Sequence, residues 1–168
     1  DSHVHIAQPS GPDIVMADDF ASATRSAAFG GNTMVLPFAM QQKGQSLRDV
    51  VSDYHKKADG QCYVDVSFHL IIADATDRVL GQELPALVHD GYTSFKVFMT
   101  YEDLALTDHQ MLEVFSVARE TGALVMVHAE NDDMIRWIAK RLIERGHGAP
   151  KFHGVAHDAI AEAEATNR

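Results

Sequence analysis

Short apolar runs alternate with amphipathic helical patterns along this chain of 168 residues, and the alternation constrains the fold more than any other feature. Five runs have the apolar character of buried β-strands; they cover residues 1–7, 32–39, 63–73, 94–99 and 123–128. Helical patterns follow at residues 18–29, 46–60, 80–90, 107–122 and 134–146, and a last one runs to residue 168. Repeated strand–helix units of this kind predict a parallel α/β sheet, either open or closed into a barrel.

The helix over residues 107–122 has clear local signals at both ends. Thr107 to Gln110 matches the capping-box pattern, and Gly122 is the residue type that commonly ends a helix. Between these ends we expect a single apolar stripe; its members are Met111, Leu112, Phe115 and Ala118.

Composition excludes several classes of partner. The net charge is −10, from 14 Lys and Arg against 24 Asp and Glu, which argues against nucleic acid or an anionic membrane surface. We expect no membrane span, because no apolar run is long enough. The single cysteine, Cys62, excludes an internal disulfide and is expected to be an inert thiol in a cytoplasmic protein. No glycine-rich phosphate fingerprint follows the first strand, which disfavours a dinucleotide-binding fold.

Lys96 interrupts a run that is otherwise typical of a buried strand. Side chains alternate along a strand, so Lys96 and Phe98 share one face and the residues between them share the other. An unpaired buried ammonium group is costly. One interpretation is that Lys96 reaches past the strand end to pair with Glu102 or Asp103. The other is that a neutral Lys96 amine takes up CO2, giving a carbamate suited to bridge two divalent cations.

Three histidines lie at or near strand ends, as Lys96 does. His3 and His5 are two residues apart on one predicted strand, so both imidazoles point to the same side, as metal ligands would. Taken alone, this pair fits a core or surface location equally well. His128 ends the fifth predicted strand, and functional residues of parallel α/β folds gather at the C-terminal strand ends. Four ligand-type residues on three strand ends favour a metal site over core packing.

Three segments carry a resemblance to a known family: Asp-Ser-His-Val-His at residues 1–5, Ser-Phe-Lys-Val-Phe-Met-Thr-Tyr at 94–101 and Val-His-Ala-Glu-Asn at 127–131. They resemble the hydantoinase/dihydropyrimidinase branch of the cyclic amidohydrolases, over the whole chain. The resemblance implies a (β/α)8 TIM-type amidohydrolase barrel, of which about the first five βα units are present, since a full barrel has about 250 residues. We therefore expect residues 1–168 to be one partial catalytic domain, truncated at both ends.

The resemblance also implies a binuclear centre of two divalent metal ions, most often Zn2+. His3 and His5 would hold the first ion, a carboxylated Lys96 would bridge the two, and His128 would bind the second. A further histidine and a catalytic aspartate belong to later strands of the family's barrel and lie outside this sequence.

Residues around the expected substrate site follow from the same resemblance. Tyr101 would hydrogen-bond the substrate carbonyl and the developing oxyanion, although a tyrosine at a strand end can also be an ordinary aromatic with its hydroxyl in water. Phe98 and the loop over residues 9–16 would lie near the pocket for the ring substituent of the substrate. Glu130 and Asn131 are expected to support His128.

Other histidines receive no functional assignment. His69 alternates with polar residues on its strand and is expected to be a satisfied residue of the core or barrel interior. The remaining ones fall on predicted helices or loops; they are His55, His89, His109, His147, His153 and His157.

The resulting functional hypothesis is metal-dependent hydrolysis of the cyclic amide bond of hydantoins or dihydropyrimidines. The expected partners are a small cyclic amide or imide and further copies of the chain, as a homodimer or homotetramer. The alternatives are a non-catalytic dihydropyrimidinase-related assembly protein, which would lack metal ligands, and an inactive fragment. The presence of all four ligand-type residues favours the enzyme.

Overall fold

Four parallel strands form the central sheet of the computed structural model, which describes residues 1–11 and 13–168. In their order across the sheet they are β2 (Phe38–Met40), β4 (His69–Ile71), β5 (Ser94–Phe98) and β6 (Leu124–His128). A separate parallel pair joins β1 (Met34–Val35) to β3 (Asp65–Val66). The register places Ile71 beside Lys96, and Lys96 beside Met126.

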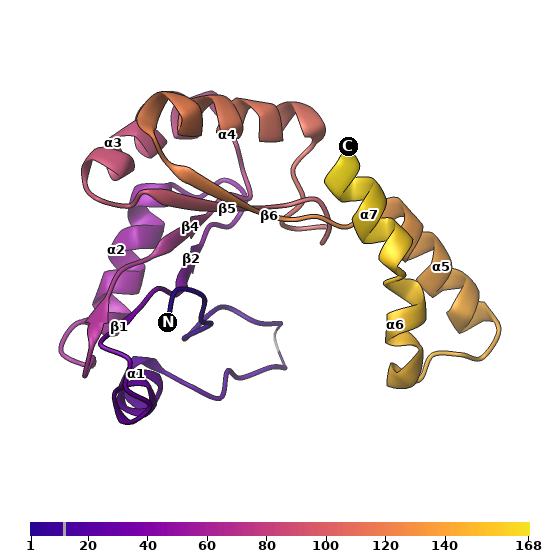
Figure 1. Cartoon of the computed structure of the whole chain (residues 1–168), viewed down its shortest axis with the longest axis horizontal. Helices are drawn as coiled ribbons and strands as arrows, with labels where there is room; N and C mark the ends of the chain where they lie inside the picture. Colours follow the sequence, from indigo (N-terminus) through magenta and orange to yellow (C-terminus); the bar gives the residue numbers. More distant parts are fainter. Residues whose placement is uncertain (12) are drawn as a thin grey trace.

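A helix follows each strand segment of the central sheet. The helical elements are α1 (Phe20–Phe29), α2 (Leu47–Ala58), a π-helical turn (Val79–Glu83), α3 (Leu84–His89), α4 (Asp108–Thr121), α5 (Asp132–Glu144), a 3-10 turn (Pro150–Phe152), α6 (His153–Ala156) and α7 (Ala159–Asn167). Helices α1 to α4 lie along one side of the curved row of strands, whereas α5 to α7 lie beyond β6 (Figure 1). None of the helices in the described ranges is both long and apolar enough to cross a membrane.

The two faces of the sheet have different surroundings. The helix-covered face carries a large apolar core; its members on the strands include Ala39, Leu70, Phe95 and Val97, and its members on the helices include Leu47, Tyr54, Leu84 and Val114. The opposite face, which we call the inner face, carries a smaller cluster made of Phe38, Met40, Ile71 and Phe98. This split follows from the period of two along a strand and confirms the predicted alternation around Lys96.

The predicted strand over residues 1–7 is wrong. Only Val4 makes a β-bridge, to Pro37. Proline has no N–H to donate to a neighbouring strand, so pairing along this edge cannot extend through Pro37. The same residue separates β1 from β2, which the sequence predicts as one strand over residues 32–39. At Ala7 the backbone takes a φ of 48° and leaves the extended conformation.

The predicted stripe of α4 is also partly wrong, although its ends are confirmed. Thr107 and Gln110 form the reciprocal capping box, and Gly122 ends the helix with a φ of 73°. The buried residues of the helix are Met111, Val114 and Ala118, which follow one another at the helical spacing of three and four. Leu112 is 65% exposed and Phe115 is 37% exposed, because both lie on the neighbouring face of the helix.

Candidate functional site

The candidate site is a cavity of about 350 Å³ on the inner face of the sheet. Its lining residues are His3, His5, Gln8, Phe38, Ile71, Lys96, Phe98, Tyr101, Leu104 and His128. Phe98 and His128 are the last residues of β5 and β6, so the cavity lies at the C-terminal strand ends. The metal-ligand and catalytic residues named from the sequence line this one cavity, and so does Phe98. A larger cavity of about 510 Å³ beside α2 contains none of them. The loop over residues 9–16, also expected near the pocket, contributes none of the lining residues, and residue 12 of that loop lies outside the described residues.

His3 and His5 flank Val4, which makes the β-bridge to Pro37. Their ring centroids lie 5.6 Å apart. Both rings pack on Phe38, with centroid distances of 4.7 Å for His3 and 5.2 Å for His5. The Nδ1 atom of His5 also contacts the side-chain carbonyl oxygen of Gln8. The two imidazoles therefore point into the same cavity, although they do not lie on a regular strand.

Lys96 lies on the inner face, close to the ring of Phe98. Among residues 1–11 and 13–168 no acidic side chain lies within ion-pair distance of its Nζ atom, which is 5.2 Å from the centroid of the Phe98 ring. The alternative pairing with Glu102 does not form: the Glu102 carboxylate lies 3.6 Å from Arg136 instead. Asp103 makes no such contact in the described ranges. Burial lowers the pKa of Lys96, which favours the neutral amine.

The imidazole of His3 has a related electrostatic character. Burial lowers the pKa of His3, and the neighbouring His5, Lys96 and His69 add to this effect. A lowered pKa favours the neutral ring, which is the form that binds a metal ion. Burial therefore favours the unprotonated form of both Lys96 and His3.

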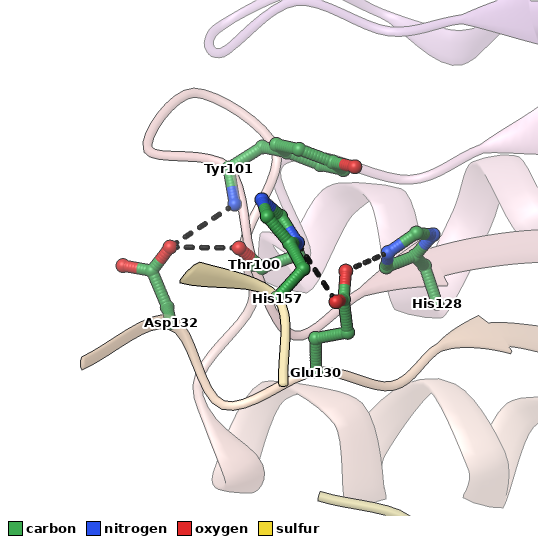
Figure 2. A network of polar contacts seen from close by, with 6 residues as sticks. All are labelled: Thr100, Tyr101, His128, Glu130, Asp132 and His157. Atoms are coloured by element: carbon green, nitrogen blue, oxygen red, sulfur yellow. Dashed lines mark hydrogen bonds and ion pairs between the residues drawn. The ribbon is translucent and has the colours of Figure 1, made fainter. Parts of the chain in front are cut away.

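His128 is held by a carboxylate that also binds a second histidine. Its Nε2 atom lies 2.6 Å from Glu130 Oε2, and Glu130 Oε1 lies 2.8 Å from Nδ1 of His157 (Figure 2). Burial acts to raise the pKa of Glu130, but the hydrogen bonds from the two imidazoles outweigh it, so the pKa lies below its usual value. Because Nε2 of His128 is engaged, Nδ1 is the ring nitrogen left free for another partner.

Tyr101 has an unusual backbone conformation for a tyrosine. Its φ is 72°, in the left-handed region, which costs a non-glycine residue about 1–3 kcal/mol. The ring lies 5.8 Å from that of Phe98 and 5.2 Å from that of His128, between centroids. Burial raises the pKa of the Tyr101 phenol, and the nearby Glu130 adds to this. The raised pKa is consistent with a protonated hydroxyl, which can donate a hydrogen bond.

Three other expectations have definite outcomes. His69 is a satisfied interior residue, as predicted: its ring nitrogens lie 2.6 Å from Ser94 Oγ and 2.8 Å from the backbone oxygen of Ser2. Asn131 does not contact His128; its side chain caps α5 at Met134 N instead. His157, which receives no role from the sequence because it falls on a predicted helix or loop, contacts Glu130 and so supports His128 indirectly.

The donor set of the cavity fits a zinc-type centre in chemical type. Three imidazoles and an amine with a lowered pKa, which can become a carbamate, are ligands that zinc accepts. Among the described residues, however, no group of three or more His, Cys, Asp or Glu side chains is arranged to hold a metal ion. The described residues therefore fit zinc by donor type, without forming a metal-binding arrangement of their own.

Comparisons with known proteins give one consistent result. No protein-family model matches the chain. It is 44% identical over 170 residues to a D-hydantoinase of Geobacillus stearothermophilus, covering 100% of this chain and 36% of the relative. It is 39% identical over 171 residues to rat dihydropyrimidinase, covering 100% of this chain and 32% of the relative. The chain thus spans about a third of the length of the curated relatives that it matches.

A solved structure gives the same outcome for the fold. The chain superimposes on D-hydantoinase from Bacillus sp. AR9 with a TM-score of 0.95 and 41% sequence identity. The match covers 100% of this chain and 37% of that structure. The predicted fold class, a partial TIM-type barrel built of parallel strands, is therefore confirmed.

Proposed function

The chain belongs to the hydantoinase/dihydropyrimidinase family, about a third of whose length it spans, and we propose that it supplies part of the active site of a metal-dependent cyclic amidohydrolase. The proposed reaction is hydrolysis of the cyclic amide bond of 5-substituted hydantoins or dihydropyrimidines. Water adds to the ring carbonyl, the ring carbon–nitrogen bond breaks, and the leaving nitrogen takes a proton. The observation that carries the proposal is the gathering of four ligand-type side chains and Tyr101 around one cavity.

Four residues are proposed to hold two divalent metal ions. His3 and His5 would bind one ion, His128 the other, and a carboxylated Lys96 both. Zinc suits this set, because it prefers imidazole nitrogen and carboxylate-type oxygen ligands. When bound, such a metal pair lowers the pKa of water and polarises a carbonyl group.

Lys96 is proposed to carry the bridging carbamate. Its neutral amine nitrogen would bond to the carbon of CO2, and one proton would be released to solvent. Two observations support this: the amine has no carboxylate partner among the described residues, and its pKa is lowered by burial. The carbamate would replace a cationic side chain by an anionic one in a cavity lined by three imidazoles.

Tyr101 is proposed to stabilise the transition state. The hydroxyl would donate a hydrogen bond to the substrate oxygen as negative charge develops on it. Its raised pKa supports this role, because a phenol must keep its proton to act as a donor. Phe98, whose ring lies beside Tyr101, would contact the apolar substituent of the substrate ring.

The proposal extends to the setting of the protein. We propose a cytoplasmic enzyme that acts as a homodimer or homotetramer, as the resemblance implies. The competing assignment, a non-catalytic assembly protein of the same fold, predicts that the cavity binds no metal.

A chimaera tests the proposed function. The matching third of the Geobacillus stearothermophilus D-hydantoinase would be replaced by this chain, and ring opening would be followed as the appearance of the N-carbamoyl product. We expect the chimaera to bind zinc and to hydrolyse hydantoins, and Lys96→Ala to lose both properties. Lys140→Ala, on the exposed side of α5, is the matched control and should retain them. A folded chimaera without zinc would contradict the proposal, and so would full turnover by the 168-residue chain alone.

A further inference from the structure

The left-handed backbone at Tyr101 needs a cause, because the residue is not a glycine. Ala7 is the other non-glycine residue with a positive φ among those described, and both residues lie in segments that border the cavity. An L-residue adopts this conformation when its surroundings impose it. The turn itself contributes, since the backbone oxygen of Tyr101 accepts hydrogen bonds from Leu104 and Ala105 at 2.9 and 2.8 Å.

A carboxylate from a different unit of the barrel holds the other side of this turn. Asp132, the first residue of α5, accepts a hydrogen bond at Oδ1 from the Thr100 hydroxyl at 2.8 Å (Figure 2). The same oxygen accepts one from the backbone N–H of Tyr101 at 3.3 Å. Thr100 is only 2% exposed, so its hydroxyl has little access to water as an alternative partner. One oxygen atom thus fixes two consecutive residues.

The second oxygen of this carboxylate ties the turn to α5. Asp132 Oδ2 lies 3.6 Å from Arg136, which also lies 3.6 Å from the carboxylate of Glu102. Residues 100 to 102 are therefore linked to the first turn of α5 by one carboxylate and one guanidinium group. Because α5 begins shortly after β6, which ends at His128, this linkage fixes the position of Tyr101 relative to His128.

We propose that Asp132 is a positioning residue for Tyr101. Through the backbone of the turn it directs the phenol back over the strand ends, where the ring lies 5.2 Å from that of His128 and lines the cavity. What the hydroxyl does in that place rests on the proposed function, whereas the positioning itself does not. The position of the phenol would thus depend on a side chain that does not line the cavity.

A simpler role for Asp132 would be to stabilise the N-terminus of α5. Negative charge in the first turn of a helix is favourable regardless of what else it contacts. Asp133 offers the matched comparison, because it occupies the same first turn and carries the same charge. In the described part of the chain it is exposed and makes no contact with the turn at Tyr101.

The test is an NMR measurement of the ring contact in the 168-residue chain. The wild type should show a nuclear Overhauser effect between the ring protons of Tyr101 and His128. We expect Asp132→Ala to lose it and Asp133→Ala to keep it. Asp132→Asn should also keep it, because its amide oxygen can accept the same two hydrogen bonds. Retention in Asp132→Ala, or equal loss in Asp133→Ala, would overturn the proposal.

A second variant covers the case in which Asp132→Ala does not fold. Thr100→Val removes the stronger of the two hydrogen bonds while leaving the charge at α5 in place, and should weaken the same signal. An unchanged signal in that variant would also overturn the proposal. If the proposed function is wrong, the chimaera will not bind zinc. That result would leave the ring contact between Tyr101 and His128 unaltered.

Discussion

The two faces of the central sheet differ in what their side chains contact. On the helix-covered face, residues such as Phe95 and Val97 are fully buried among apolar neighbours. On the inner face, Lys96 lies one position away on the same strand, with an aromatic ring as its neighbour and no carboxylate partner among the described residues. The single strand β5 therefore places side chains both in the apolar core and in the cavity.

The helix-covered face contributes mainly to stability, whereas the inner face carries the groups expected to take part in chemistry. The covered face gains its free energy from burial of apolar area, at about 25 cal/mol per Å². The inner face retains groups whose charged forms are disfavoured, since burial lowers the pKa of both Lys96 and His3. Groups of this kind cluster at functional sites. The comparison predicts that substitutions on the two faces have different consequences.

The largest expected effect is on the covered face. Phe95→Ala should lower the free energy of unfolding by about 3–5 kcal/mol, because Phe95 is fully buried and its removal leaves a cavity. Phe98→Ala, on the same strand but beside the open cavity, should cost less, about 1–3 kcal/mol. Urea denaturation of both variants measures the difference. Equal losses would mean that the two faces do not differ in packing.

The next effect concerns the contact that joins β6 to α6. Glu130→Gln should lower stability by about 1–2 kcal/mol, because it weakens two hydrogen bonds to imidazoles. The pKa of Glu130 is lowered in the folded state, so its contribution is present above the unfolded pKa, near 4.5, and is lost as pH falls through the folded pKa. Denaturation from pH 7 to pH 3 should show this acid-dependent part vanish in the variant. His153→Gln, beside His157, serves as control and should preserve it.

A small gain is expected at Lys96. Lys96→Met removes a half-buried ammonium that has no carboxylate partner among residues 1–11 and 13–168. The substitution should raise the stability of the metal-free chain by no more than about 1 kcal/mol. Because the folded pKa is lowered, the charge is most destabilising below that pKa, and the penalty disappears as pH rises toward the unfolded value of 10.5. The gain should therefore shrink in alkaline solution. A loss of stability at pH 7 would indicate a partner for the amine.

The smallest effect is predicted on α4. Leu112→Ser should change stability by less than about 0.5 kcal/mol, since Leu112 is 65% exposed. Val114→Ser, on the buried side of the same helix, should be clearly destabilising. Thermal unfolding of the pair distinguishes the observed stripe from the one expected from the sequence.

The sequence was sufficient for the parts of the fold that rest on local patterns. The alternation around Lys96 follows from the pleat of a strand, and the ends of α4 follow from Thr107 and Gly122. The prediction of a first strand was wrong because its neighbouring segment contains Pro37, which has no N–H to donate. This contact joins segments that are distant in the sequence. The predicted apolar stripe of α4 was partly wrong because hydrophobicity alone does not show that Val114 is buried and Leu112 exposed.

The candidate site shows the same division. The polar residues expected to do chemistry, and Phe98, could be named from residue type, strand position and family resemblance. Four other lining residues were not named from the sequence; they are Gln8, Phe38, Ile71 and Leu104. The residues that position the polar side chains could not be predicted from the sequence. His157 contacts Glu130 across 27 residues, and Asp132 contacts Thr100 across 32. Such pairings depend on how α5 and α6 pack, which no local spacing encodes.

Native mass spectrometry of the chimaera, prepared with zinc and bicarbonate, tests the central claim most directly. The account predicts bound zinc together with one added CO2, both lost in Lys96→Ala and retained in Lys140→Ala. A folded chimaera with no zinc and an unmodified Lys96, or one whose added CO2 persists in Lys96→Ala, would contradict it.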